Sequence, residues 1–160
     1  MDIKIISIVL ISGLLALSSF IWLSGCSRNT STATTNSTIV FSGYTWNVKV
    51  YDSPTGPGPN IFSNSSNNVW VDSVGQLHLK ITHRNNAWQC AEVFLQNNLG
   101  YGKYIFQLAG RPDLIDQNVI LGMFTWDDAS ADAASHNNRE MDVEISRWSD
   151  PAGMNLQFTI

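Results

Sequence analysis

Hydrophobic and polar residues alternate along much of the chain beyond residue 39, with the two-residue period of a β-strand. The clearest case is residues 76–82, where Leu77, Leu79 and Ile81 fall on one face and polar residues fall on the other. No segment after residue 26 has a helical period of ten or more residues, so the sequence predicts an all-β protein, an antiparallel sandwich or barrel. Gly, Asn, Pro and Asp turn residues bound further predicted strands at residues 46–51, 88–96, 101–108, 118–126 and 155–160.

The first 26 residues read differently, as a targeting segment. A short polar start with one Lys precedes the uncharged stretch 5–23, and L-S-G-C follows at residues 23–26. Small residues directly before a Cys are typical of the lipobox of bacterial-type lipoproteins, in which a peptidase cuts before the Cys and acyl chains anchor the mature protein. We therefore predict a lipoprotein signal peptide over residues 1–26, with lipidation at Cys26. An uncleaved signal anchor is the alternative, because the apolar stretch is long enough to span a bilayer.

Both alternatives place the folded part of the chain outside the cytoplasm. Residues 27–38 are rich in Ser, Thr and Asn and lack large apolar side chains, so they are predicted to form an unfolded tether. Residues 39–160 are then the one folded domain. With Cys26 lipidated, Cys90 has no disulfide partner and is predicted to be an inert core residue. Because residues 155–160 read as a strand with no closing turn, we expect the chain to be the front part of a longer protein.

Composition and charge narrow the classes of function. The formal net charge is −4, whereas a nucleic-acid-binding protein needs a basic patch to neutralise phosphates. Six Trp, four Tyr and seven Phe are many for this length. Aromatic residues favour strands, so a β core explains most of them, but they also stack on the apolar faces of sugar rings.

The candidate chemistry lies in residues 139–145, R-E-M-D-V-E-I, where every second residue is acidic. If this segment is a strand, Glu140, Asp142 and Glu144 share one face, and the apolar residues between them point into a core. Neighbouring acids are then about 6.5–7 Å apart at Cα. Like charges in such a row destabilise a strand, so a chemical role is a better reason for them than folding.

Glycoside hydrolysis supplies such a role, because it needs one carboxylate as nucleophile or base and one protonated carboxyl as acid. Crowded carboxylates cannot all ionise easily, so one of them stays protonated nearer neutral pH. The long side chains of Glu140 and Glu144 could bring their carboxyl groups to the ~5–5.5 Å separation of a retaining enzyme. A solvated acidic strand and a Ca²⁺ site are the alternatives.

The same residues resemble family 16 of the glycoside hydrolases, the group of laminarinases, lichenases and carrageenases. E-M-D-V-E at residues 140–144 matches the family's E-x-D-x-E signature, in the form without a β-bulge. L-G-Y-G-K-Y at residues 99–104 resembles a strand start of the family, and residues 118–126 resemble the apolar strand that precedes the acidic one. The resemblance extends over residues 41–160. It implies a concanavalin A-like jelly roll whose curved sheet forms a glycan cleft.

The resemblance also implies roles for the three acids. Glu140 would be the nucleophile, Asp142 its assistant and Glu144 the acid/base, with retention of configuration. Strands expected after the acidic motif are missing from the chain, so the sheet would be incomplete at its C-terminal end. We therefore expect weak or no activity from these 160 residues alone.

Three tryptophans are candidates for substrate binding, with core packing as the alternative for each. Trp148 has the strand parity of the acids, Trp126 ends the predicted strand before them, and Trp88 begins another. The His residues show no metal-ligand spacing, and neither a Ser–His–Asp set nor a phosphate loop can be argued. No metal or cofactor is therefore predicted, although a structural Ca²⁺ stays open.

Together these features predict a retaining endo-β-glycanase, a hydrolase that cuts O-glycosidic bonds of a polysaccharide by double displacement. It would be secreted, or anchored to the cell membrane by its N-terminal lipid. The expected partners are the polysaccharide and the membrane, with no nucleic acid, and the protein is expected to be a monomer. A non-catalytic glycan-binding or adhesion module on the same sandwich is the alternative, and a cell-surface structural domain without a ligand is the third hypothesis.

Overall fold

The computed structural model describes residues 5–12, 37–95, 97, 99–126 and 140–160, and for residues 5–12 it describes the backbone. The protein is nearly all β, with 48% strand and 3% helix. One short 3₁₀ helix, η1 (Pro112–Leu114), lies among the strands of the described ranges. The strands are β1 (Ile5–Ser12), β2 (Thr38–Phe41), β3 (Tyr44–Val48), β4 (Tyr51–Thr55), β5 (Asn60–Phe62), β6 (Val69–Val71), β7 (Leu77–Leu79), β8 (Thr82–Arg84), β9 (Ala87–Leu95), β10 (Val119–Trp126), β11 (Met141–Ile145) and β12 (Leu156–Thr159).

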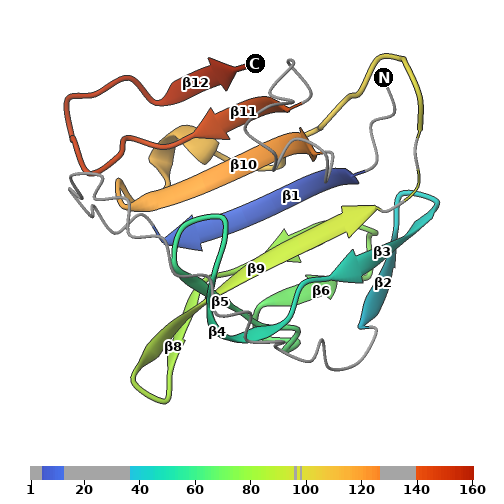
Figure 1. The fold of residues 1–160 in the computed structure, drawn as a ribbon, viewed down its shortest axis with the longest axis horizontal. Helices are drawn as coiled ribbons and strands as arrows, with labels where there is room; N and C mark the ends of the chain where they lie inside the picture. Colours follow the sequence, from blue (N-terminus) through green and yellow to red (C-terminus); the bar gives the residue numbers. More distant parts are fainter. Residues whose placement is uncertain (1–4, 13–36, 96, 98, 127–139) are drawn as a thin grey trace, which may run out of the picture.

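One large sheet carries most of these strands, in the order β12-β11-β10-β1-β9-β3-β2 (Figure 1). Every neighbouring pair along this order is antiparallel. β8 pairs antiparallel with the start of β9, and β5 pairs parallel with it, while β4 pairs with β5. β6 and β7 form a separate two-stranded sheet.

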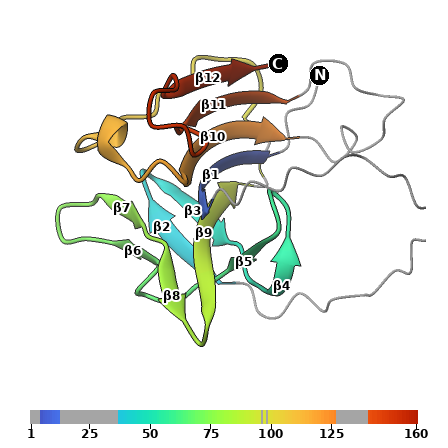
Figure 2. The same cartoon turned by 90° about the vertical axis from the view of Figure 1, so that its left-hand side faces the viewer.

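The two sheets pack face to face, which confirms the predicted all-β, antiparallel sandwich (Figure 2). Figure 2 places β6 and β7 on one side of the large sheet and β4 on the other. Apolar side chains of β3 and β9 meet those of the small sheet, because alternate strand positions point to the same face. The buried members of this core are Trp46, Val48, Val69, Ala91, Val93 and Leu95, with Leu77 and Leu79 packed against them.

A second, smaller cluster lies on the opposite side of β9. Phe62 is 1% exposed and Cys90 is 0% exposed, and Ile81, Ile120 and Phe124 pack against them. Cys90 is fully buried, as predicted for a core residue, and its thiol donates to Oδ1 of Asn60 at 3.4 Å. Both faces of β9 are therefore covered, which explains why this strand reads as a nearly continuous apolar run.

The predicted strands at residues 88–96, 118–126 and 155–160 are confirmed as β9, β10 and β12. The predicted strands at 46–51 and 76–82 are each divided between two elements. The second division occurs where the buried amide of Asn68 donates to the carbonyl oxygen of Lys80 at 2.8 Å and to that of Gln89 at 3.0 Å. A side-chain amide thus takes the place of a strand neighbour at this point.

The predicted strand at residues 101–108 is wrong, because this segment is not a strand in the structure. The sheet position between β9 and β10 is held by β1, which comes from the predicted signal peptide. Signal cleavage itself stays a prediction, since Cys26 and residues 27–36 lie outside the described residues. No helix in the described part of the chain is long and apolar enough to cross a membrane.

Candidate active site

The acidic segment forms β11, an inner strand between β10 and β12. Asp142 and Glu144 are two residues apart on this strand and therefore share a face, as the alternation predicts. Glu140 directly precedes β11, and extending the strand register by one residue places it opposite Trp126. The three acids therefore lie on one face of the large sheet, one strand away from its edge strand β12.

Each acid has a distinct neighbour on β10. Gly122 is paired with Glu144, so no side chain from this position fills the space beside the glutamate. Phe124 is paired with Asp142 and presents an aromatic ring on the same face. On the other flank, β12 places Gln157 beside Glu144 and Thr159 beside Asp142. The acids are half-buried among these neighbours.

All three carboxyl groups bind protons more tightly than a free side chain does. The pKa of Glu140 is raised to about 7, first by burial and then by the charges of Asp142 and Glu144. Burial also raises the pKa of Asp142. For Glu144, burial is the larger cause of a raised pKa, and the charge of Asp142 adds to it. With a pKa of about 7, the carboxyl group of Glu140 holds a proton part of the time near neutral pH, as a general acid must.

The apolar residues of β11 lie on the opposite face, as predicted, but they are only partly covered. Met141 is 39% exposed, and Phe158, which pairs with Val143, is 70% exposed. The buried core lies over β3 and β9, and it does not extend as far as β11 and β12. Among the described residues, the back of the acidic strand thus has an incomplete apolar layer.

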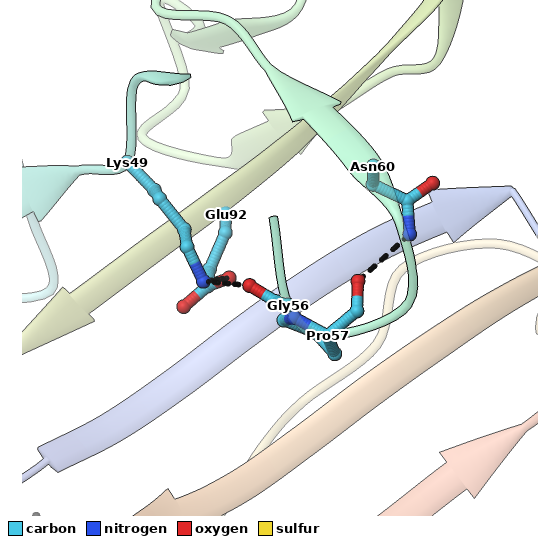
Figure 3. Close-up of polar contacts among 5 residues, drawn as sticks. All are labelled: Lys49, Gly56, Pro57, Asn60 and Glu92. Atoms are coloured by element: carbon cyan, nitrogen blue, oxygen red, sulfur yellow. Dashed lines mark hydrogen bonds and ion pairs between the residues drawn. The ribbon is translucent and has the colours of Figure 1, made fainter. Parts of the chain in front are cut away.

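A buried ion pair joins Lys49 and Glu92 (Figure 3). Glu92 of β9 is in register, through β1 and β10, with Glu144, so both side chains belong to one sheet face. Glu92 is 4% exposed, and its carboxylate accepts a 2.8 Å hydrogen bond from Lys49 Nζ. Lys49 Nζ also lies 4.5 Å from the ring centroid of Phe62. The charge of Lys49 is therefore held by a carboxylate and an aromatic face together.

The same lysine fixes the loop between β4 and β5. Lys49 Nζ donates to the carbonyl oxygen of Gly56 at 2.6 Å, and the side-chain amide of Asn60 donates to that of Pro57 at 2.8 Å (Figure 3). Through these bonds the loop is held on the acid-bearing side of the sheet. The sequence analysis missed this arrangement, although an acid inside the apolar run C-A-E-V-F-L at residues 90–95 was a usable signal for a buried ion pair.

The structure treats the three candidate tryptophans differently. Trp126 is half-buried and lies on the face of the acids, opposite Glu140. Trp148 lies beyond the end of β11, in a turn with φ 46°, so strand parity does not determine where its side chain points. Trp88 is 54% exposed in the hairpin of β8 and β9, where its ring meets His83 at 4.9 Å. Figure 1 places this hairpin at the opposite end of the molecule from β11, so Trp88 is not brought to the acids.

Residues 127–138 are the longest irregular stretch of the sequence and directly precede the acidic segment, so we expect them to shape the rim of a cleft or to form a short helix. They and Arg139 lie outside the described residues. Within the described ranges, no group of three or more His, Cys, Asp and Glu side chains could hold a metal ion.

Comparisons of the chain with family profiles, with curated proteins and with solved structures find no match.

Proposed function

We propose that this protein is a retaining endo-β-glycanase, which hydrolyses O-glycosidic bonds of a polysaccharide on the acid-bearing face of its large sheet. The observation that carries the proposal is the row of Glu140, Asp142 and Glu144 on one face, with the pKa of each carboxyl group raised. Burial is the first cause of each raised pKa, so these acids do not merely face water. Half-burial of such a row costs stability, and catalysis gives a reason to accept that cost.

Two steps of proton and group transfer complete the reaction. An ionised carboxylate attacks the anomeric carbon, while a protonated carboxyl donates its proton to the departing glycosidic oxygen. This breaks the glycosidic bond and leaves a glycosyl ester on the protein. The acid, now a carboxylate, then takes a proton from water, whose oxygen displaces the ester with overall retention. Both the chain's charge state and the sugar's configuration are restored.

The roles of the two glutamates can be assigned in two ways. The resemblance to family 16 implies Glu140 as nucleophile and Glu144 as acid/base, with Asp142 between them. The pKa of Glu140, at about 7, is instead that of the carboxyl group that holds a proton near neutral pH in the free protein. Asp142 lies between both glutamates and can share a proton with either, so binding of a sugar on the acid-bearing face can move the proton along the row.

Hydrolysis is tested with the full-length protein on laminarin, lichenan, agar and carrageenan, by release of reducing ends. Glu140→Gln and Glu144→Gln should each lower the rate by at least about 100-fold, because each removes a group that transfers a proton or forms a bond. Asp52→Asn, at an exposed position of β4, is the matched control and should keep the rate. A wild-type rate in either glutamine variant would refute the enzyme hypothesis, and glycan binding without any hydrolysis would favour the binding module.

Azide separates the two role assignments. When the nucleophile is replaced by Ala, azide can attack the anomeric carbon directly, and the product has inverted configuration. When the acid/base is replaced by Ala, an activated aryl glycoside can still form the glycosyl ester on the protein. Azide then attacks this ester, and the product keeps the configuration of the substrate. An inverted glycosyl azide from Glu140→Ala would support Glu140 as nucleophile. A retained product from the same variant would give that role to Glu144.

A further inference from the structure

The position of β1 in the large sheet raises a question about the mature protein. β1 is antiparallel to β10 over its whole length, from Ile5↔Trp126 to Ser12↔Val119, and antiparallel to β9 over five pairs. β9 and β10 therefore run in the same direction, and β1 is the strand that pairs with both of them. Without β1, the acidic strand β11 and its neighbours β10 and β12 would lose their hydrogen-bonded connection to the rest of the sheet.

A second segment of the chain fits the same position in direction and length. Residues 101–108 lie between β9 and β10 in the sequence, and they have the same length as β1. A strand formed there would leave β9, return antiparallel to it, and lead into β10 by a second reversal. This is a simple meander, in which consecutive strands are neighbours and antiparallel. The connection before the segment and the one after it are both short enough for such reversals.

Residues 101–108 already alternate as a strand does, although they form no ladder. Tyr104 and Phe106 are half-buried and pack against the core that contains Val93 and Leu95 of β9. Their neighbours on the chain are exposed, and Ile105 is 75% exposed. Within the described part of the chain, the backbone of residues 101–108 forms no hydrogen bond with other backbone groups. The segment thus already packs one face against the core of β3 and β9, as a strand between β9 and β10 would, while its backbone is open to water.

We propose that residues 5–12 and residues 101–108 are alternative occupants of one sheet position. β1 holds the position in the chain that still carries its predicted signal peptide. Residues 101–108 enter the position when the signal peptide is removed. A register that keeps Tyr104 and Phe106 on the core face lets the exchange proceed without losing their packing. The exchange also keeps β10 paired on both sides, so the acid-bearing face is preserved through maturation.

The test is hydrogen exchange with mass spectrometry on the full chain. In the wild-type chain, residues 5–12 should be protected and residues 101–108 should exchange fast. Val9→Pro removes a backbone donor in the middle of an inner strand, where proline is not tolerated. It should displace β1 and slow exchange in residues 101–108 by about 100-fold or more, while β9 and β10 stay protected. Ile5→Pro is the matched control, since proline is tolerated at the first residue of a strand, and it should leave the wild-type pattern unchanged.

Ile105→Pro makes the test complete. Alone it should be nearly neutral, because Ile105 is exposed and outside any strand in the unprocessed chain. Combined with Val9→Pro it should abolish the protection of those amides of β9 and β10 that face this position, because neither segment can then fill it, whereas amides paired with β3 and β11 keep their partners. The chain that a bacterial host exports and cleaves before Cys26 should show protected residues 101–108 without any substitution. Fast exchange at 101–108 in the cleaved chain or in Val9→Pro would overturn the proposal, and so would unfolding of Val9→Pro itself.

Discussion

The raised pKa of Glu140 predicts that this residue destabilises the folded protein in neutral and alkaline solution. The unperturbed pKa is 4.5 and the folded value is about 7. Below pH 4.5 the carboxyl group is protonated in both states, so it contributes no difference. Between pH 4.5 and 7 the folded protein holds a proton that the unfolded chain has lost, and stability therefore falls as the pH rises. Above pH 7 the full penalty is present.

The size of this penalty follows from linkage and from exposure. One pKa unit corresponds to about 1.4 kcal/mol, so the shift sets an upper limit of roughly 3 kcal/mol. Glu140 is only half-buried, and solvent screening reduces the figure to about 1 kcal/mol. Glu140→Gln carries no charge at any pH and removes the penalty. For a domain of this size, that gain corresponds to an increase in Tm of about 4 °C at pH 8.

Thermal unfolding, followed by circular dichroism at pH 4, 5.5 and 8, measures the effect. We compare the Tm of Glu140→Gln with that of the wild type at each pH. The Tm of the variant minus that of the wild type should be about 4 °C larger at pH 8 than at pH 4. Taking the difference relative to pH 4 cancels any change in packing or hydrogen bonding that the amide itself causes. Asp52→Asn removes one negative charge at an exposed site of β4 and controls for net charge. A Tm difference that does not change with pH would refute the reasoning.

Three further predictions follow from the contacts of the acid-bearing face. Asp142→Asn should lower the pKa of Glu140, since it removes one of the charges that raise it, and carboxyl NMR titration measures the change. Lys49→Met should cost about 3–5 kcal/mol in urea unfolding, because the buried carboxylate of Glu92 loses its cation, and adding Glu92→Leu should recover most of that loss. Gly58→Ala should lower the free energy of unfolding by about 1 kcal/mol or more, because Gly58 has φ 70° and a Cβ would lie 2.4 Å from the side-chain nitrogen of the asparagine two residues later.

The strands that sequence analysis predicted well are those whose pattern and burial agree. β9 and β10 combine apolar content with clear turn signals, and they lie at the centre of the sheet, where packing reinforces propensity. Residues 101–108 have an equally good local pattern, and the prediction there was wrong. Alternation of apolar and polar residues indicates that a segment can form a strand. It does not indicate which of two suitable segments occupies a given position in the sheet. That choice depends on contacts between residues far apart in the chain.

The acidic face shows the same division between local and long-range information. Alternation alone predicts that Asp142 and Glu144 share a face, and the register confirms it. The pair of Lys49 and Glu92 joins residues 43 positions apart, and no local pattern could have named the lysine. An acid at position 92 in an apolar run only signals that some cation must be near.

The cause of the raised pKa values also differs from what the sequence suggested. Crowding of like charges was the sequence argument for a proton held near neutral pH, yet burial is the first cause for Glu140, Asp142 and Glu144 alike. Strand pairing supplies that burial, since β10 places Phe124 beside Asp142 and Trp126 beside Glu140. The aromatic residues that could contact a sugar are thus also the residues positioned to remove water from the acids. If the proposed function holds, their replacement by small residues should weaken sugar binding and also return the pKa values of the carboxyl groups toward ordinary values, because the same rings serve both.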